Sequence, residues 1–273
     1  MIQEGIYPNL SNEEYHAQKT HISRSALMDF DKSPYSYWAN HINPDRPIKE
    51  STPAMELGTA FHCMILEPDL FKDRYLIMNE KVLKKENPEQ YEINKELERK
   101  AEQTKKTVLS FATYKILRDM RDNFRANKTA KELIAGAIFE SSYFWQDEHS
   151  EINLKCRPDA LQENMIIDLK TCADASERTI QNEIFKRGYD IQMSMIKDGI
   201  ECIEGKKIKK FILICIENKY PYNIGIYILD DEIIENATYK YKNLLLRLKE
   251  CKEKNEWEDY GIKKIFLPKW AIS

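Results

Sequence analysis

Cysteine is the first residue type whose usage limits what this chain can be. Its 273 residues include six cysteines, and no two of them form a CxxC pair. Zinc and iron–sulfur sites usually draw on closely spaced cysteines, so we predict neither kind of site. The six are Cys63, Cys156, Cys172, Cys202, Cys215 and Cys251. With no signal peptide at the start of the sequence, they are most simply reduced thiols of a cytoplasmic protein.

Long apolar runs and an excess of one charge are also missing. The longest uninterrupted apolar stretches fall far short of the roughly twenty residues that cross a bilayer, which argues against a membrane protein. The 42 basic and 45 acidic side chains leave a formal net charge of -3. This balance neither favours nor excludes nucleic acid as a partner, because phosphate contacts depend on local rather than total charge.

The chain does contain enough apolar material for a packed core. Hydrophobic residues make up 42% and aromatic residues 11% of the sequence, which separates it from disordered chains. Its length suits one large domain, and we predict a single domain that spans residues 1–273. The stretch 80–106 is the most polar part, dense in Lys, Glu, Gln and Asn. We expect a solvated helical excursion or a mobile insertion there.

Hydrophobic periodicity predicts an α/β fold. Apolar spacings of three and four residues predict helices, and short apolar runs between polar turns predict strands. Helices are expected at 23–30, after Ser33-Pro34, at 55–66, 108–135 and 174–200, and from Asp230 onward. Strands are expected at 138–145, 151–161 and 164–171 as a β-meander, and at 210–217 and 223–229. This order describes a central mixed β-sheet flanked by helices, with a helical N-terminal segment.

Two acids and a lysine form the most informative pattern. Asp159 lies near the end of the second predicted strand, and Asp168 and Lys170 lie on the third. Residues two apart on a strand project from the same face, so Asp168 and Lys170 should point together. A hairpin can bring the two carboxylates within reach of one divalent cation, and acids with a neighbouring lysine suit phosphodiester hydrolysis. The plainer alternative is an ordinary surface hairpin, which the apolar neighbours of Asp168 argue against.

Further side chains could join this site. His62 lies on an apolar helix, where it is either a core histidine or a metal ligand. Glu140, on the first predicted strand, is either a surface acid or another ligand for metal or water. Tyr189 and Gln192 are three apart on one helix face, where they either flank solvent or orient Lys170 and a phosphate.

A small cationic and hydroxyl-rich group precedes these residues in the chain. Arg24, Ser25 and Ser33 lie near the starts of two predicted helices. Arginine and hydroxyl side chains at helix N-termini can bind phosphate, although helix capping alone would explain the serines. Arg157, two residues before Asp159, is a further candidate for a DNA contact.

Taken in order, these segments resemble the PD-(D/E)xK nucleases and, more closely, the phage-type exonuclease VIII (RecE) group, relatives of lambda exonuclease. The resemblance covers most of the chain apart from 80–106. Its motifs are Tyr15-His16-Ala17, Ile22-Ser23-Arg24-Ser25-Ala26-Leu27, Ser33-Pro34-Tyr35-Ser36-Tyr37, Gly58-Thr59-Ala60-Phe61-His62-Cys63-Met64-Ile65-Leu66-Glu67-Pro68, Cys156-Arg157-Pro158-Asp159, Ile167-Asp168-Leu169-Lys170-Thr171 and Tyr189-Asp190-Ile191-Gln192. One departure is Asp168, where Glu is commoner in the wider superfamily.

The resemblance implies a role for each of these residues. The implied ligands of Mg²⁺, which Mn²⁺ can replace, are His62, Glu140, Asp159, Asp168 and the carbonyl of Leu169. The implied catalytic residues are Asp159, Asp168, Lys170, Tyr189 and Gln192. Within that set, Lys170 would position or activate the attacking water. Arg24 with Ser25 or Ser33 would clamp a 5′-terminal phosphate.

The activity implied is a 5′→3′ exonuclease on double-stranded DNA that leaves a 3′ single strand for a recombinase or annealing protein. Relatives assemble as closed rings, so the resemblance also implies a homo-oligomer. Two other functions stay open. One is a RecB-like nuclease acting on single strands or within a repair complex, and the lack of clustered cysteines argues against its iron–sulfur versions. The other is a non-catalytic DNA-binding module on the same fold.

Overall fold

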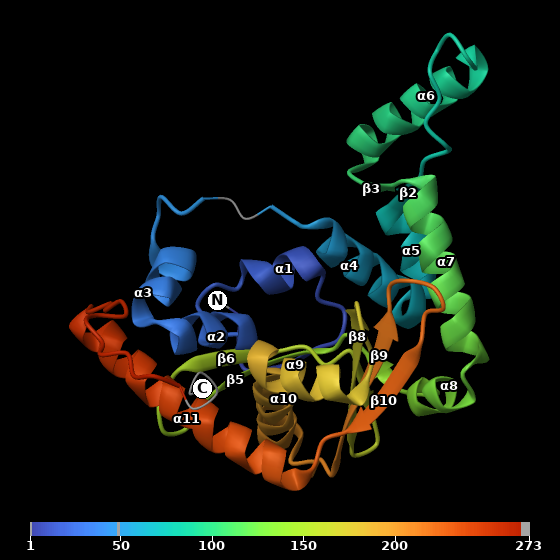
Figure 1. Cartoon of the computed structure of the whole chain (residues 1–273). Coiled ribbons are helices and arrows are strands. Elements are labelled where there is room, and N and C mark those ends of the chain that lie inside the picture. The colour runs from blue at the N-terminus through green and yellow to red at the C-terminus, as the bar shows by residue number, and fades with distance from the viewer. Residues whose placement is uncertain (1, 48–49, 269–273) are drawn as a thin grey trace.

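The computed structural model describes residues 2–47 and 50–268, and a mixed five-stranded sheet lies at its centre (Figure 1). The strand order is β10-β9-β8-β7-β4, with β8 and β9 parallel and the other pairs antiparallel. The strands are β4 (Ile138–Phe139), β7 (Ala160–Gln162), β8 (Met165–Cys172), β9 (Lys210–Glu217) and β10 (Ile224–Ile228). Two helices connect the parallel pair, because parallel neighbours need a crossover. The predicted α/β fold with a mixed sheet is confirmed.

Two smaller sheets accompany the central one. An antiparallel sheet contains β1 (Gly5–Tyr7), β5 (Ser142–Gln146) and β6 (Asn153–Cys156), and a parallel pair contains β2 (Tyr75–Ile77) and β3 (Thr107–Leu109). Segments 138–145 and 151–161, each expected as one strand, therefore divide between two sheets. The single β-meander expected here was wrong. Glu140 turns the first segment with a φ of 51°, and Pro158, which cannot donate to a ladder, interrupts the second.

Helices cover both faces of the central sheet. On one side lie α2 (Arg24–Lys32), α9 (Glu177–Arg187), α10 (Tyr189–Glu204) and α11 (Asp231–Lys254). On the other lie α4 (Pro53–Leu66), α5 (Pro68–Arg74), α7 (Phe111–Ala126) and α8 (Lys128–Ile134). The rest are α1 (Asn12–Ala17), α3 (Pro34–Tyr37) with a π-helical continuation (Trp38–Ile42), and α6 (Pro88–Thr104). Among the helices in the described residues, none is long and apolar enough to cross a membrane.

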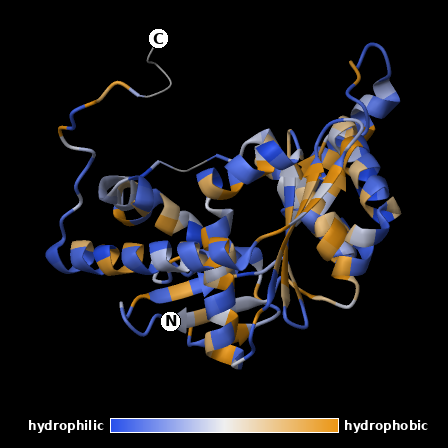
Figure 2. Cartoon of the chain, turned by 60° about the horizontal axis from the view of Figure 1, so that its bottom comes forward, coloured by the Kyte–Doolittle hydropathy of each residue, from blue (hydrophilic) through white to orange (hydrophobic). Residues whose placement is uncertain are grey.

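The two faces of the sheet bury separate hydrophobic cores. Phe211 and Leu213 of β9 belong to the core beneath α10 and α11. Ile212 and Ile214, which alternate with them, belong to the core beneath α4 and α7. All four are at most 3% exposed, and Figure 2 shows the apolar residues concentrated on these strands. Helices on both sides thus enclose the sheet, which gives the side chains at its edge a rigid support.

Two long predicted helices are interrupted in the structure. Segment 108–135 begins with β3, and its helical part breaks at Asn127, whose side chain accepts from the Ala130 N–H and caps α8. Segment 174–200 breaks at Gly188, whose φ of 67° separates α9 from α10. The C-terminal helix is confirmed, with Asp230 as its N-cap. Polar segment 80–106 contains α6, which projects away from the central sheet (Figure 1).

Candidate active site

Three side chains from separate parts of the chain form a cluster that could bind a metal ion. His62 comes from α4, Glu140 from the turn between β4 and β5, and Asp159 from the link between β6 and β7. One ligand atom from each lies within 4.8 Å of the others, and His62 Nδ1 is 3.5 Å from Asp159 Oδ2. Imidazole and carboxylate groups are ligands that divalent cations accept. The donor set therefore fits a resident divalent ion.

The register of the β7–β8 hairpin explains where Asp159 lies. Ala160 pairs with Ile167 as the last pair of the hairpin. The next step along the two strands would place Asp159 opposite Asp168. Beyond that point β8 no longer pairs with β7, and the Leu169 N–H donates to Asp159 Oδ2 at 2.7 Å. The hairpin thus brings the two predicted acids to adjacent positions and anchors one of them on the backbone.

Asp168, Lys170 and Gln192 form a second polar group beside the cluster. Lys170 Nζ lies 2.5 Å from Asp168 Oδ2, and Gln192 Nε2 donates to Asp168 Oδ1 at 2.7 Å. Lys170 also donates to Gln192 Oε1 at 3.2 Å and lies 4.8 Å from the centroid of the Tyr189 ring. Asp168 is only 1% exposed, so protein groups rather than water balance its charge. Tyr189 and Gln192, on α10, thus both contact Lys170.

Asp168 lies outside the three-residue cluster. The sequence predicted His62, Glu140, Asp159 and Asp168 as side-chain ligands of one metal ion. Among the described residues, the group of potential ligands contains the first three and does not contain Asp168. Asp168 Oδ2 instead lies 2.5 Å from the Lys170 ammonium, which would compete with a cation for that oxygen. The structure thus brings the expected ligands together in part.

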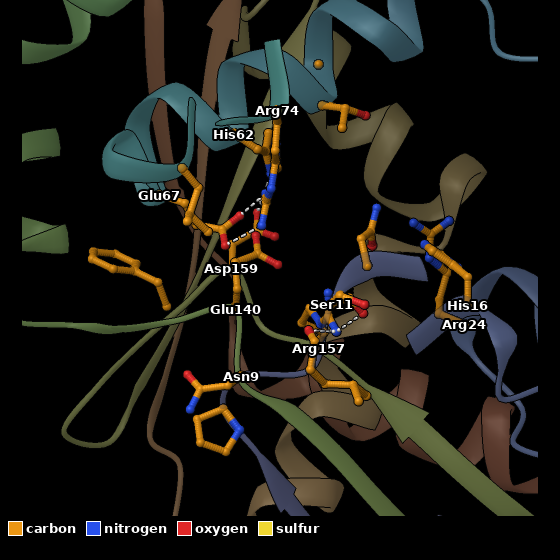
Figure 3. Close-up of a pocket in the computed structure, with 17 residues that line it drawn as sticks. Asn9, Ser11, His16, Arg24, His62, Glu67, Arg74, Glu140, Arg157 and Asp159 are labelled. Carbon is orange, nitrogen blue, oxygen red and sulfur yellow. Dashed lines mark hydrogen bonds and ion pairs between the residues drawn. The ribbon is translucent and has the colours of Figure 1, made fainter. Parts of the chain in front are cut away.

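A cavity of about 770 Å³ opens onto the cluster (Figure 3). Its wall carries three acids, three arginines and two histidines, namely Glu67, Glu140, Asp159, Arg24, Arg74, Arg157, His16 and His62. A second cavity, of about 260 Å³, shares Arg24 and Arg157 with the first and is also lined by Ser25 and Gln192. Acids that can hold a cation, next to arginines that can hold phosphate, are what a nucleic-acid enzyme requires.

The charges of the cluster shift one another's pKa. Burial, together with the charge of Asp159, raises the pKa of Glu140 to about 8. Burial also acts to raise the pKa of Asp159, but His62, Lys170 and the Leu169 N–H lower it overall. Burial alone would lower the pKa of His62, but the Asp159 carboxylate outweighs this effect and the net shift is upward. An acid that keeps its proton at neutral pH marks a site short of positive charge, which a divalent cation would supply.

We expect the affinity for divalent metal to rise with pH up to about 8. Glu140 holds a proton below its pKa of about 8, so a metal ion must displace that proton at neutral pH. The affinity should increase by up to about tenfold per pH unit for each proton displaced. Calorimetric titration with Mn²⁺, in two buffers of different ionisation enthalpy, measures both the affinity and the protons released.

The Glu140→Gln variant should bind Mn²⁺ more weakly and release fewer protons than the wild type. Glu148→Gln is the matched control, because Glu148 is an exposed acid in the β5–β6 turn, at the end of β5 opposite Glu140. An affinity that does not change with pH, with no proton release, would contradict this prediction.

Arg24 and Ser25 lie where a phosphate could reach them. Arg24 donates to Gln192 Oε1 at 3.3 Å and lines both cavities. The Ser25 hydroxyl lies 3.0 Å from the Ser23 hydroxyl, at the wall of the second cavity. Ser23, the N-cap residue of α2, makes no capping hydrogen bond with its side chain, so the Ser23 and Ser25 hydroxyls remain available to a ligand.

Ser33 and Arg157 are held by the protein itself. Ser33 is 3% exposed and its Oγ accepts from the Ser36 N–H at 3.0 Å, so it is a helix cap and not the phosphate contact expected. Arg157 donates to Ser142 Oγ at 2.8 Å and to the Leu10 carbonyl at 2.9 Å. It borders both cavities, but its N–H donors hold β5 and the N-terminal segment. Its contact with DNA stays a prediction.

Sequence reasoning missed Glu67 and Arg74 on the wall of the larger cavity. They form an ion pair at the corner between α4 and α5. The position of Glu67 in the sequence could have identified it, because Glu67 follows His62 by five residues at the end of the same helix. His16 of α1 also lines the cavity, and its signal in the sequence was its place in the Tyr15-His16-Ala17 motif of the family resemblance.

Known proteins share this architecture. The profile described as "PDDEXK-like domain of unknown function (DUF3799)" matches residues 23–264. The fold is similar to the crystal structure of a protein from Eubacterium rectale named a "putative exonuclease", with a TM-score of 0.66. The two chains are 15% identical over 95% of this chain and 96% of that one, so this likeness concerns the fold. No match was found among the curated proteins.

Proposed function

This chain belongs to the family of PDDEXK-like domains, and from that premise we propose that it is a metal-dependent nuclease that hydrolyses phosphodiester bonds of DNA. The observation that carries the proposal is the convergence of His62, Glu140 and Asp159 on one cavity. Beside that cluster lies the Asp168–Lys170 ion pair on β8, which places an acid and an ammonium next to the candidate metal site, as phosphodiester hydrolysis requires. Family membership supplies the fold, and the side chains supply the reason to expect activity.

The ion is expected to be Mg²⁺, with Mn²⁺ as a substitute. His62, Glu140 and Asp159 would hold it, and the resemblance adds Asp168 and the Leu169 carbonyl as further ligands. Oxygen-rich sites with carboxylates suit Mg²⁺ and Mn²⁺, and one imidazole is compatible with both. When bound, the ion supplies positive charge that polarises the phosphate and makes a water molecule a better nucleophile.

Lys170 is the chain's own positive charge at the reaction centre. Burial alone would lower the pKa of Lys170, but Asp168 and Asp159 raise it above the ordinary lysine value, so the ammonium persists at neutral pH. Contacts with Asp168 and Gln192 fix its position. A fixed ammonium can orient the attacking water and stabilise the charge that develops on the phosphoryl oxygens.

The substrate we propose is the end of double-stranded DNA, digested from the 5′ end. Arg24 and Ser25, beside the second cavity, support a site for a terminal phosphate, because a guanidinium and hydroxyls bind phosphate oxygens well. The product would be a 3′ single strand, which a recombinase or annealing protein would receive. A ring-shaped homo-oligomer that acts in cytoplasmic DNA recombination and repair completes the proposal.

Digestion of end-labelled linear duplex tests both the activity and its polarity. With Mg²⁺, a 5′ label should be released at once, whereas a 3′ label should stay on a long single strand. EDTA should abolish release, and a covalently closed circular duplex should stay intact. Early release of the 3′ label, or nicking of the circle, would reject the 5′ exonuclease. No metal-dependent cleavage of any DNA would reject the nuclease itself.

The same assay separates the alternatives. Faster digestion of single-stranded than of double-stranded DNA would favour the RecB-like nuclease. DNA binding without cleavage would favour a non-catalytic module. We rank the enzyme first, because the candidate metal ligands and Lys170 are all present and in contact with one another or with their neighbours.

A further inference from the structure

Glu67 and Arg74 lie on the wall of the cavity that holds the metal-binding cluster (Figure 3). Glu67 is at the corner between α4 and α5, and Arg74 is in the last turn of α5. Figure 3 shows both side chains extending toward Asp159 and Glu140. They are therefore placed to act on whatever enters the cavity.

The two side chains form a bidentate ion pair. Arg74 Nη1 lies 2.5 Å from Glu67 Oε2, and Arg74 Nη2 lies 2.9 Å from Glu67 Oε1. Nη1 is also 3.8 Å from the sulfur of Cys63. Two parallel bonds fix the plane of a guanidinium as well as its position. Partly exposed ion pairs add little to folding stability, so this fixed orientation is better explained by the cavity that it faces.

Arg74 keeps hydrogen-bond donors for a ligand. A guanidinium carries more N–H donors than the contacts with Glu67 and Cys63 use. The side chain of Arg74 is 40% exposed, whereas that of Glu67 is 22% exposed. The Arg74 guanidinium is thus the more accessible of the two groups from the cavity, and the Glu67 carboxylate lies behind it.

The cavity needs a fixed cation of this kind if a phosphate is to enter. Asp159 lines the cavity, and the negative charge of its carboxylate would repel a phosphate. The other two arginines of the wall have other roles: Arg24, which donates to Gln192, is assigned above to a terminal phosphate, and Arg157 donates to Ser142 and to the Leu10 carbonyl. Arg74 is held only by groups at the α4–α5 corner, among the contacts of the described residues.

We propose that Arg74, oriented by Glu67, binds a non-bridging oxygen of the DNA phosphate that enters the metal cavity. Arg74 would contact the substrate, and Glu67 would be a positioning residue. The inference deepens the nuclease function proposed above and rests on it.

DNA binding measured in EDTA tests the contact without requiring catalysis. In fluorescence anisotropy with a short labelled duplex, Arg74→Gln should weaken binding about tenfold and reduce the salt slope by about one unit. Arg74→Lys should restore the slope, because it keeps the charge, but only part of the affinity. Arg118→Gln is the matched control, since Arg118 is a surface arginine of α7 whose ion pair with Asp119 is outside the cavity. Equal affinity and equal slope for Arg74→Gln and Arg118→Gln would overturn the inference.

A double variant tests the role of Glu67. Glu67→Gln should raise KM for DNA several-fold with a smaller change in kcat. Because Glu67 acts through Arg74, the Glu67→Gln/Arg74→Gln protein should be no worse than Arg74→Gln alone. A double variant much worse than Arg74→Gln would make Glu67 an independent contact and overturn its positioning role.

The two proposals fail in distinguishable ways. If the wild type binds duplex but cleaves no DNA, and Arg74→Gln weakens that binding, the nuclease function is refuted and the phosphate contact is retained. A wild type that cleaves DNA, with Arg74→Gln behaving as Arg118→Gln, would refute the contact alone.

Discussion

Replacing Lys170 by glutamine should lower the rate of DNA cleavage by about 10² to 10³-fold, the usual cost of losing one preorganised donor at a developing charge. The ammonium lies 2.5 Å from Asp168 and 3.2 Å from Gln192, so its position is fixed before any substrate arrives. Glutamine keeps much of the side-chain volume and can still hydrogen-bond the buried Asp168, but it carries no charge. The initial rate of label release from linear duplex with Mg²⁺ measures the effect.

The matched control is Lys210→Gln. Lys210 lies on β9, the parallel neighbour of β8, but it is exposed and pairs in register with Met165 at the other end of the strand. Its replacement should leave both cleavage and the thermal unfolding temperature unchanged. A folded Lys170→Gln protein that cleaves DNA as fast as the control would remove this lysine from the mechanism.

The sequence predicts best those helices and strands whose own apolar pattern shows which of their residues are buried. In α11, Leu244, Leu245 and Leu248 recur at helical spacing and all are buried. In β9, every residue from Phe211 to Ile216 is buried, which produces a continuous apolar run that reads as a strand enclosed on both faces. Such patterns depend on one element and its immediate neighbours, so a single sequence is enough to find them.

The division of the first two predicted strands could not be found in this way. Residues 138–145 have one apolar pattern, but Ile138 pairs with Leu161 in the central sheet while Phe144 pairs with Lys155 in the smaller one. The switch occurs at Glu140, a non-glycine residue with a positive φ. Glutamate has no special preference for that conformation, so tertiary contacts rather than local propensity must stabilise it.

The candidate site shows the same limit. The hairpin that places Asp159 beside Asp168 follows from strand spacing and a short turn, and the sequence predicted it. The convergence of His62 and Glu140 with Asp159 depends on how α4 packs on the sheet and on the turn between β4 and β5. From the residues alone, each of the two side chains was only one of two alternatives, and the family resemblance favoured the metal ligand. That Asp168 would pair with Lys170 was visible from their spacing, but that Asp168 would lie outside the three-residue cluster was not.

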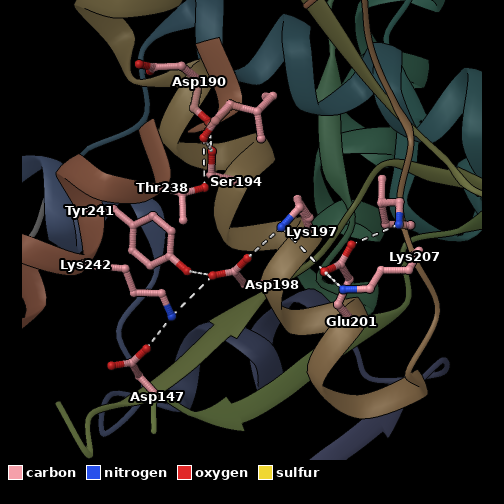
Figure 4. A network of polar contacts seen from close by, with 12 residues as sticks. Asp147, Asp190, Ser194, Lys197, Asp198, Glu201, Lys207, Thr238, Tyr241 and Lys242 are labelled. Atoms are coloured by element: carbon pink, nitrogen blue, oxygen red, sulfur yellow. Dashed lines mark hydrogen bonds and ion pairs between the residues drawn. The ribbon is translucent and has the colours of Figure 1, made fainter. Parts of the chain in front are cut away.

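A separate polar network joins α11 to α10 and to the turn between β5 and β6 (Figure 4). Lys242 forms ion pairs with Asp147 and with Asp198, the latter at 3.2 Å. Ser150 donates to Asp147 Oδ2 from its backbone at 2.9 Å and from its hydroxyl at 2.7 Å. The Tyr241 hydroxyl donates to Asp198. The Asp147 side chain is 3% exposed, so Lys242 balances a charge that water cannot reach.

Replacing Lys242 by methionine should therefore lower the free energy of unfolding by about 2 to 4 kcal/mol, because it leaves a buried carboxylate without its cation. Methionine fills a similar volume, so the cost is electrostatic rather than a cavity. Lys249→Met is the control, seven residues later on the same helix, whose partner Glu151 is 70% exposed. That variant should lose only about 0 to 1 kcal/mol. Urea unfolding of the three proteins at pH 7 measures the difference.

The pH dependence of this difference identifies its cause. Burial alone would raise the pKa of Asp147, but hydrogen bonds from Lys242 and Ser150 hold it below the ordinary value of 3.8. A depressed carboxyl pKa stabilises the fold at any pH above the unfolded value, and this contribution is lost as the pH falls through the folded value. Without Lys242 the Asp147 pKa should rise, so Asp147 should be protonated at a higher pH in the variant than in the wild type. Protonation removes the unpaired charge and therefore part of the destabilisation. The gap between the two should narrow as the pH falls from 7 toward about 4. Two results would contradict this explanation. One is a difference in free energy of unfolding between the wild type and Lys242→Met that stays constant with pH. The other is an equal loss of stability in Lys249→Met at pH 7.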